Sequence, residues 1–344
     1  MPSTTVNGRH LLKNYPSGYP IPGTTTIYDT SERLDLDTVP LNGGVLAKLV
    51  VLSIDPYLRN TIKGNAPGSV QLGQPLTGFG IVKVIRSEVP AHSTGDYLSV
   101  NGLYHQEYSI FTKDQLSSAE LLKADNRLPL SVHLGAAGPT GLTAFAGWKE
   151  FAKVKKGDTV FVSTAAGAVG SLVVQLAKLE SLKVIGSAGS DEKVKFLKEL
   201  GVDVAFNYKT TDLRDVLKKE GPIDLYWDNV GGDTLDAALE NASTGARVII
   251  CGSISSYNHA ATSAGVKNLL HLTSKEINLY GLSYFALAPK YDAEFKKTVI
   301  PKLADGTFKY LEDRKFGLDQ APQAMLDVQN GGNTGKSVII LSDD

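Results

Sequence analysis

The sequence has 344 residues, of which 42% are hydrophobic and 21% charged, and a formal net charge of -1. These values are typical of a soluble globular chain long enough for two domains, and the near-neutral charge favours neither nucleic acid nor an anionic membrane as a partner. The single cysteine, Cys251, excludes an internal disulfide and a multi-cysteine metal site. No apolar stretch could cross a bilayer, and residues 1–22 lack the apolar centre of a signal peptide, so we expect a cytoplasmic protein.

The first third of the chain alternates short apolar runs with turn residues. These runs lie at 45–54, 80–85, 97–100 and 107–111. Many short strands at this spacing favour a small β-barrel. The composition changes near residues 128–130, so we place this domain at residues 1–131.

Strands and helices then alternate regularly. The expected strands are 159–163, 183–187, 204–206, 223–228, 247–252 and 277–282. The expected helices between them are 169–179, 191–200, 212–219 and 234–241. This pattern predicts an α/β domain with a doubly wound parallel sheet, at residues 132–302. Residues 303–344 hold a strand, a helix and a last strand without a core of their own, so we expect them to return to the first domain.

The turn after the strand at 159–163 carries the clearest functional signal. Ala165, Gly167 and Gly170 have the spacing of G-x-G-x-x-G, with alanine in the first place. Gly167 would let the backbone approach a pyrophosphate, and Gly170 would let the helix lie close to the strand. The free N–H groups of a helix start attract an anion. The turn therefore predicts a dinucleotide site.

The second strand indicates which dinucleotide binds. NAD sites place an acid at its end to bind the ribose 2′-hydroxyl, whereas this strand runs into residues 185–190 without one. Asp191 and Glu192 follow only in the first turn of the next helix, where the helix dipole favours acids. Lys193 in that turn and Tyr208 after the third strand could bind a 2′-phosphate, each charge-assisted bond contributing about 1.5–3 kcal/mol. This favours NADPH, with a merely solvated Lys193 as the alternative.

The residues offer little for metal or acid–base chemistry. The six histidines are scattered without ligand spacing, so no metal is expected. No tyrosine is followed four places later by lysine, and there is no G-x-S-x-G. Two tyrosines are candidates for catalysis, with packing roles as the alternative. Tyr257 follows the strand that we expect to end at Gly252, at the sheet edge where ligands bind, and Tyr57 lies in a turn of the barrel domain.

Eight segments together resemble one family. They are residues 55–59, 138–144, 166–170, 186–194, 206–209, 228–232, 251–258 and 332–336. On these segments the chain resembles the zinc-independent medium-chain dehydrogenases/reductases. Within that superfamily it is similar to the NADPH-dependent alkenal/one double-bond reductases. The chain departs from the family at Pro139, where a methionine is usual, at residues 282–285 and at residues 259–275.

The resemblance implies a GroES-like β-barrel domain and a Rossmann domain, with NADPH in the cleft between them. By position, Ala166, Gly167, Ala168 and Val169 would bind the pyrophosphate, and Lys193 and Tyr208 the 2′-phosphate. The residues expected to line the rest of the cofactor path are Asn229, Cys251, Gly252, Ser253, Ile254, Tyr257, Leu282, Ser283, Tyr284 and Asn333. Tyr57 and Tyr257 would face the substrate carbonyl.

The implied reaction is conjugate reduction of an α,β-unsaturated aldehyde or ketone. Hydride passes from the nicotinamide to the β-carbon, and hydrogen bonds from Tyr257 or the cofactor hold the enolate oxygen. Tyr257 or water then protonates the α-carbon. Quinone reduction with NADPH, and dinucleotide binding without turnover, are the alternatives. A homodimer formed through the edge of the nucleotide-binding sheet is also expected from the family.

Overall fold

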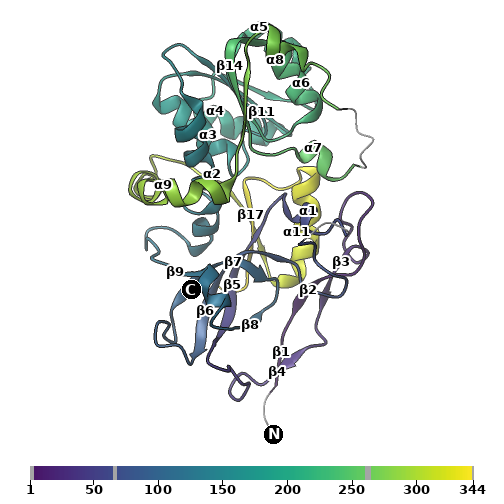
Figure 1. Ribbon diagram of the computed structural model, residues 1–344, viewed down its shortest axis with the longest axis vertical. Helices are drawn as coiled ribbons and strands as arrows, with labels where there is room; N and C mark the ends of the chain where they lie inside the picture. The colour runs from purple at the N-terminus through teal and green to yellow at the C-terminus, as the bar shows by residue number, and fades with distance from the viewer. Residues whose placement is uncertain (1–3, 65–67, 260–264, 343–344) are drawn as a thin grey trace. The chain divides into compact units, whose positions relative to one another are not determined.

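The computed structural model describes residues 4–64, 68–259 and 265–342, and the chain divides into two compact units (Figure 1). The first unit comprises Met1–Leu134, Glu312–Asn333 and Ser337–Asp344. The second comprises Gly135–Leu311 and Thr334–Lys336. No helix within the described ranges is both long and apolar enough to cross a membrane.

The first unit is built on a seven-stranded sheet, in which the pairings between neighbours from β17 to β9 are antiparallel. Its path runs β16-β17-β5-β6-β7-β9, with β8 paired to β5. The strands are β5 (Val45–Ile54), β6 (Thr77–Ser87), β7 (Tyr97–Tyr104), β8 (Tyr108–Phe111), β9 (Ala119–Leu121), β16 (Glu312–Phe316) and β17 (Lys336–Ile340). Ser337 of β17 lies opposite Ile54 of β5, so the C-terminal strand completes a sheet begun near the N-terminus.

Short elements surround this sheet. The pairs are β1 (Thr5–Val6) with β4 (Arg33–Leu34), and β2 (Arg9–Leu12) with β3 (Thr26–Asp29). The helices are α1 (Leu58–Thr61) and α11 (Ala321–Asn330), with 3-10 turns at Gln115–Ser118, Leu130–Leu134 and Leu318–Gln320. Met325 of α11 packs into the apolar core with Leu52 and Ile339.

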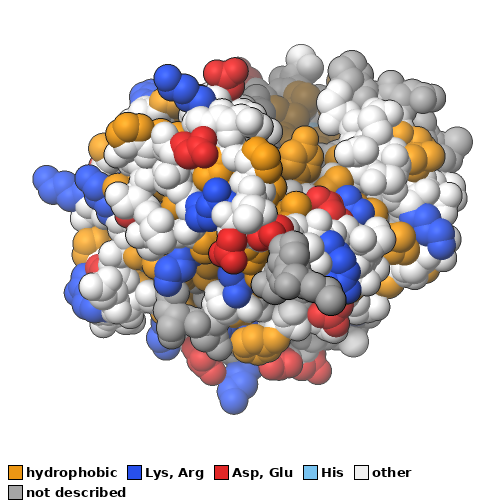
Figure 2. Space-filling view, turned by 90° about the horizontal axis from the view of Figure 1, so that it is seen from below, with side chains coloured by type: hydrophobic (Ala, Val, Ile, Leu, Met, Phe, Trp, Pro, Cys, Tyr) orange, Lys and Arg blue, Asp and Glu red, His pale blue; other side chains and the backbone are white. Residues whose placement is uncertain are grey.

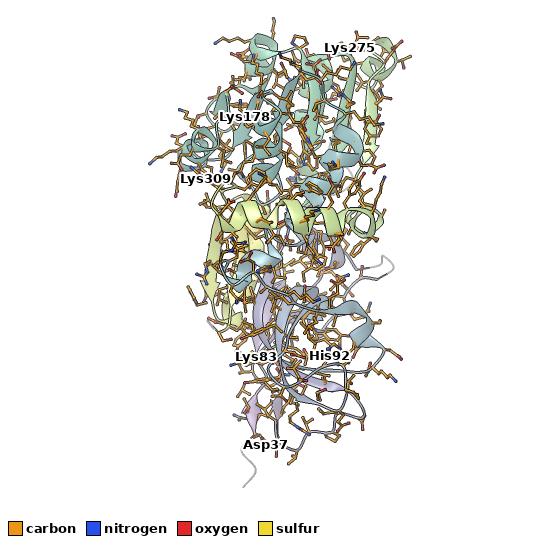
Figure 3. The ribbon with its side chains drawn as sticks, turned by 90° about the vertical axis from the view of Figure 1, so that its left-hand side faces the viewer. Asp37, Lys83, His92, Lys178, Lys275 and Lys309 are labelled. Carbon is orange, nitrogen blue, oxygen red and sulfur yellow. The ribbon has the colours of Figure 1, made fainter. Side chains whose placement is uncertain are left out.

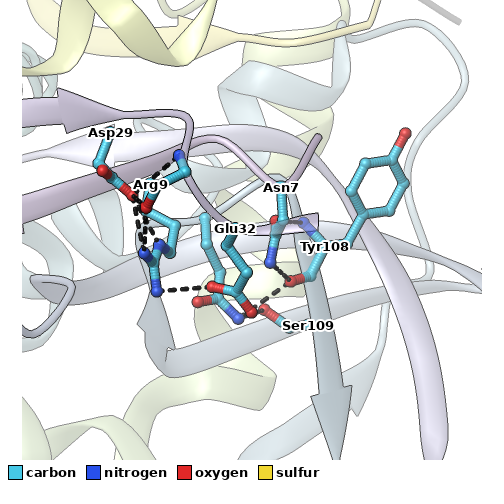
Figure 4. A network of polar contacts seen from close by, with 8 residues as sticks. Asn7, Arg9, Asp29, Glu32, Tyr108 and Ser109 are labelled. Atoms are coloured by element: carbon cyan, nitrogen blue, oxygen red, sulfur yellow. Dashed lines mark hydrogen bonds and ion pairs between the residues drawn. The ribbon is translucent and has the colours of Figure 1, made fainter. Parts of the chain in front are cut away.

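Polar contacts join β2 to β3 and link the residues beside β1 and β4 to β2 and β8 (Figure 4). Arg9 forms ion pairs with Asp29 at 2.7 Å and with Glu32 at 2.6 Å. The Asn7 amide donates to the Tyr108 carbonyl at 3.1 Å, and the Tyr108 N–H donates back to Asn7 Oδ1 at 2.8 Å. One face of the molecule shows basic and acidic side chains interspersed (Figure 2).

The second unit contains the predicted parallel sheet, with six strands in the order β12-β11-β10-β13-β14-β15. The strands are β10 (Thr159–Val162), β11 (Lys183–Ala188), β12 (Val204–Asn207), β13 (Ile223–Asp228), β14 (Ala242–Ile250) and β15 (Asn278–Gly281). Helices α3 (Gly170–Leu179) and α4 (Asp191–Glu199) pack against β10, β11 and β12, and α6 (Gly232–Glu240) packs against β13. The fold class is therefore confirmed.

The expected strand at 247–252 is wrong at both ends. β14 begins at Ala242 and ends at Ile250. The N–H groups of Cys251 and Gly252 both donate to the Asp228 carbonyl, at 2.8 and 3.1 Å, instead of continuing the ladder with β15. These two residues therefore belong to the loop that follows the strand.

The remaining helices belong to the same unit as this sheet. They are α2 (Pro139–Gly147), α5 (Leu213–Glu220), α7 (Ile254–Tyr257), α8 (Leu270–Ser274), α9 (Tyr284–Thr298) and α10 (Ile300–Ala304), with a π-turn at Trp148–Ala152. Helix α9 was not predicted from the sequence. It packs on α2, with the ring centroids of Phe145 and Phe295 5.9 Å apart. Pro139 occupies the first position of α2, where a missing N–H costs nothing.

Candidate functional site

The sheet register brings the ends of four parallel strands to one edge. Val162 of β10 lies opposite Gly186 and Trp227, and Asp228 of β13 lies opposite Ile250 of β14. The loops that follow these strands therefore emerge together at the carboxyl edge of the sheet. Ligands of open parallel sheets bind at this edge.

The opposite edge is occupied by internal contacts. Lys178 near the end of α3 donates to Asp203 at 2.8 Å, and Lys275 before β15 donates to the Glu240 carbonyl at 2.7 Å. Both lysines are labelled in Figure 3. These contacts tie the helix ends to the starts of the strands.

The turn from β10 to α3 has the close approach that its glycines predict. A Cβ on Gly170 would lie 2.6 Å from the Thr164 carbonyl oxygen and 2.8 Å from the Ala165 Cα, so only glycine lets this helix start so near the strand. A Cβ on Gly167 would meet only the Thr164 oxygen, at 3.1 Å. Thr164 itself has a φ of 47°, which turns the chain sharply after β10.

The amides of this turn form a donor set for an anion. The Gly167 N–H donates to Thr164, but within the described part of the chain the N–H groups of Ala166, Ala168 and Val169 donate to no other group. They stand at the start of a ten-residue helix, where the dipole also favours negative charge. This donor set fits a pyrophosphate.

Lys193 and Tyr208 both lie next to the end of β11. The Ser190 side chain caps α4 by accepting the Lys193 N–H at 3.3 Å. The Tyr208 N–H donates to the Ala188 carbonyl at 3.0 Å, and a Cβ on Gly189 would lie 2.9 Å from the Tyr208 hydroxyl oxygen. The Tyr208 side chain thus lies over the loop that follows β11, and 45% of the residue is exposed.

A buried acid that is not among the predicted site residues holds the loop that follows β13. Asp228 Oδ1 accepts the Tyr226 hydroxyl at 2.6 Å and the N–H groups of Val230 at 2.9 Å and Gly231 at 2.8 Å. Burial raises the pKa of the Asp228 carboxyl above its ordinary value. An acid that ends a buried strand and precedes Asn-Val-Gly-Gly is the sequence signal for such a turn.

Asn229 is fixed by the end of β10. Its backbone N–H donates to the Ser163 hydroxyl at 3.0 Å, and its side-chain amide donates to the Ser163 carbonyl at 2.7 Å. The Trp227 indole N–H donates to Asn229 Oδ1 at 3.3 Å. Asn229 is therefore held at this edge by the end of β10 and by the strand that precedes it, β13.

Residues 251–257 form hydrogen bonds with the loop that follows β13. The N–H groups of Ile254 and Ser255 donate to the carbonyls of Asn229 and Val230, at 3.4 and 3.1 Å. The Ser253 N–H donates to the Tyr257 hydroxyl oxygen at 3.3 Å, so the phenol is tied to its own loop. Burial raises the pKa of the Cys251 thiol to about 12, which keeps it neutral.

Other predicted site residues lie in different surroundings. The Leu282 N–H donates to the Ile250 carbonyl at 3.0 Å, but its side chain packs against Gly147. Ser283 precedes α9, and Tyr284 begins it. Of the segment 259–275, residues 260–264 lie outside the described residues.

Tyr57 and Asn333 belong to the first unit, whereas the other predicted site residues belong to the second. Tyr57 precedes α1 and packs edge-on against Phe79, with ring centroids 6.3 Å apart. Burial raises the pKa of the Tyr57 hydroxyl, with the nearby Asp55 adding to the effect, so the phenol stays protonated.

The parallel sheet and the donor set at its carboxyl edge are those of a dinucleotide-binding protein. Comparisons with known proteins identify its family. Residues 168–305 match the family model described as zinc-binding dehydrogenase, and residues 9–118 match that of the N-terminal domain of oxidoreductase. The chain is 42% identical to a 2-alkenal reductase (NADP(+)-dependent) of Nicotiana tabacum, over 98% of each chain. It is 39% identical to the (+)-pulegone reductase of Mentha piperita, over 88% of this chain and 89% of that one.

A solved structure agrees with these relatives. CurA of Vibrio vulnificus, in complex with NADPH, superimposes with a TM-score of 0.87 and 31% identity, over 98% of this chain and 100% of CurA. The chain therefore belongs to the medium-chain dehydrogenase/reductase family, among its alkenal/double-bond reductases.

Proposed function

We propose that this chain is an NADPH-dependent reductase of the carbon–carbon double bond of α,β-unsaturated aldehydes and ketones. The observation that carries the proposal is the donor set at the carboxyl edge, in a chain whose relatives at 42% and 39% identity are named as 2-alkenal and pulegone reductases. The bound cofactor supplies the hydride for the β-carbon, so the chain has to bind, orient and stabilise rather than provide a strong acid or base.

The cofactor contacts follow from the places of the residues at this edge. The N–H groups of residues 166–169 would bind the pyrophosphate, and Lys193 with Tyr208 the 2′-phosphate. The residues proposed to line the rest of the cofactor path are Asn229, Cys251, Gly252, Ser253, Ile254, Tyr257, Leu282, Ser283 and Tyr284. Asn333, which belongs to the first unit, is proposed from the family resemblance alone. For Leu282 the backbone would provide this contact, because its side chain packs against Gly147.

Tyr257 would form a hydrogen bond with the substrate carbonyl oxygen. Its hydroxyl oxygen accepts the Ser253 N–H, which orients the phenol and favours its role as a hydrogen-bond donor. Donation to the substrate carbonyl would stabilise the negative charge that develops there when hydride reaches the β-carbon. The α-carbon would then take its proton from Tyr257 or from water. Tyr57, which burial keeps neutral, would be a second donor to the same oxygen.

We propose that the site works without zinc, because the chain has one cysteine and its six histidines do not have the spacing of zinc ligands. Zinc sites of this family type use thiolate and imidazole ligands, whereas Cys251 is the single cysteine and is held as a neutral thiol. Among the residues that the structure describes, no three His, Cys, Asp or Glu side chains are grouped so that they could hold a metal ion.

The proposed assembly is a cytoplasmic homodimer that pairs through β15. This strand ends the sheet order, and Leu279 within it is 39% exposed. Leu270 of the preceding helix is 78% exposed. A second copy pairing along this edge would cover both. Light scattering coupled to gel filtration tests this, and a monomeric wild type would contradict it.

A substrate panel tests the reaction. NADPH consumption is measured with a 2-alkenal, a short enone and a quinone, and product analysis identifies the bond that is reduced. We expect turnover of the alkenal and the enone. Turnover of the quinone alone would replace the proposal with quinone reduction, and NADPH binding without oxidation by any acceptor would indicate a non-catalytic protein.

The phosphate site is tested with Lys193→Ala. We expect the KM for NADPH to rise about ten- to hundredfold, the effect of losing one charge-assisted hydrogen bond, with little change for NADH. Lys195→Ala, which removes an exposed lysine from the same helix, is the matched control and should change neither KM. An equal rise for both cofactors would refute the phosphate role of Lys193.

A further inference from the structure

An acidic residue stands close to the place where NAD sites have one. Asp191 is the first residue of α4, three positions after β11 ends at Ala188, and it is exposed. A carboxylate beside the ribose would accept the 2′-hydroxyl of NADH and would repel the 2′-phosphate of NADPH. Among the described residues no lysine or arginine forms an ion pair with Asp191, and its side-chain partner is the neutral amide of Asn207.

The structure holds this carboxylate at the neighbouring strand. The side-chain amide of Asn207 donates to Asp191 Oδ1 at 2.9 Å. Asn207 is the last residue of β12 and lies opposite Ala188 in the sheet register. The contact therefore joins the beginning of α4 to the end of β12.

The orientation of the Asn207 amide is fixed by its own turn. Its Oδ1 accepts the Lys209 N–H at 3.1 Å, so its nitrogen has to face Asp191. Its backbone carbonyl accepts the N–H groups of Thr210 and Thr211, at 3.1 and 2.9 Å. Asn207 is thus a rigid donor directed at one carboxylate.

We propose that Asn207 is a cofactor-specificity residue, which holds the Asp191 carboxylate at the end of β12 and so keeps it from the ribose 2′ position. The inference rests on the proposed function, because it concerns the 2′-phosphate expected at Lys193 and Tyr208. Asn207 acts through Asp191 and is a positioning residue. Its loss would free the carboxylate to accept a ribose hydroxyl and to oppose the phosphate.

The alternative is that Asn207 has a purely structural role, because the same hydrogen bond joins α4 to β12. A mechanical tie would affect both cofactors alike, because it would displace Lys193 together with the loop after β11. Release of a carboxylate affects them in opposite directions, and only while the carboxylate is present. The two roles therefore differ in the ratio of kcat/KM for NADPH to that for NADH.

A double-mutant cycle measures this ratio. In Asn207→Ala we expect it to fall about tenfold, the size of one hydrogen bond or close charge pair near water, with NADH use increasing. In Asp191→Asn it should stay at the wild-type value or rise. In the double variant the removal of the carboxylate should restore the wild-type ratio. Melting temperatures of all four proteins control for folding.

Several results would overturn the inference. An equal loss with both cofactors in Asn207→Ala, or a double variant that keeps the low ratio, would leave only the mechanical tie. Asn207→Asp provides a second variant, because a carboxylate there opposes both Asp191 and the phosphate; an unchanged ratio in it would also contradict the proposal. A wild type without preference for NADPH would refute the proposed phosphate site, and this inference with it.

Discussion

The hydroxyl of Tyr226 donates a 2.6 Å hydrogen bond to Oδ1 of Asp228, two residues further along β13, and both side chains are buried. The same carboxylate oxygen accepts two N–H groups of the following loop, and the Asp228 carbonyl accepts those of Cys251 and Gly252. One residue therefore holds two loops of the proposed cofactor site in a fixed relation.

Asp228→Ala should weaken both the fold and NADPH binding. It removes the acceptor of three hydrogen bonds, and we expect a loss of about 3 kcal/mol in the free energy of unfolding, since bonds to a buried charged group contribute 1.5–3 kcal/mol each and part is regained by removing a buried charge. We also expect an NADPH Kd at least tenfold higher. Tyr226→Phe removes only one of the three donors, so we expect a smaller loss in the free energy of unfolding and a smaller rise in the NADPH Kd. Loss of stability with an unchanged Kd would show that Asp228 does not position the site.

The two glycines of the β10–α3 turn should respond differently to alanine. In Gly170→Ala the new methyl meets backbone atoms on two sides, so we expect a loss of about 1–3 kcal/mol in stability. In Gly167→Ala the fold should persist, because the new methyl meets only the Thr164 carbonyl oxygen, at 3.1 Å, and a small shift of that group relieves the contact. NADPH binding should weaken, because the methyl occupies space proposed for the pyrophosphate. Thermal melts and NADPH titrations separate the two, and equal melting temperatures would contradict this assignment.

The parallel sheet could be predicted from the sequence because its strands are short runs of apolar residues and the first four are each followed by a helical pattern. The β13 prediction matches the structure at both ends. α9 was missed because it contains Pro289 and buries only Tyr291 and Phe295. A single pair four residues apart gives too little periodicity to reveal a helix of fifteen residues.

The conformation of the turn at residues 165–170 was predictable, because its glycine motif is continuous in the chain. The role of Asp228 was not, because its partners come from its own strand, the next loop and the loop after β14. The inward packing of Leu282 likewise depends on Gly147, which is distant in sequence. The assignment of Lys193 and Tyr208 to a 2′-phosphate stays a prediction.

A buried histidine pair in the first unit should make the protein sensitive to mild acid. His10 and His105 are fully buried, with their Nδ1 atoms 3.2 Å apart. Burial lowers the pKa of His10 to about 3 and that of His105 well below its ordinary value. Both stay neutral in the folded protein, whereas the unfolded chain binds protons below about pH 6.5, so stability is lost as pH falls through that value.

The stability is measured from urea unfolding between pH 7 and pH 5, and the slope should approach about 1.4 kcal/mol per pH unit for each such histidine as pH falls well below 6.5. His133, whose pKa burial also lowers, adds to the same slope. His105→Gln should reduce this slope by the contribution of one histidine, about 1.4 kcal/mol per pH unit well below pH 6.5. A free energy of unfolding that is constant over this range would contradict the prediction.

Tyr257→Phe tests the proposed oxyanion donor. A donor to the developing charge is worth about 100- to 1,000-fold in kcat, and we expect a loss of that order with a 2-alkenal. The variant keeps the ring but loses the acceptor of the Ser253 N–H, so the NADPH Kd should rise only about threefold, as for one neutral hydrogen bond at a partly exposed position. Tyr57→Phe, in the other unit, should lower kcat with no change in NADPH Kd. If kcat for Tyr257→Phe equals that of the wild type while the NADPH Kd rises, the hydroxyl only stabilises its own loop. The proton and the hydrogen bond to the enolate oxygen would then come from other groups.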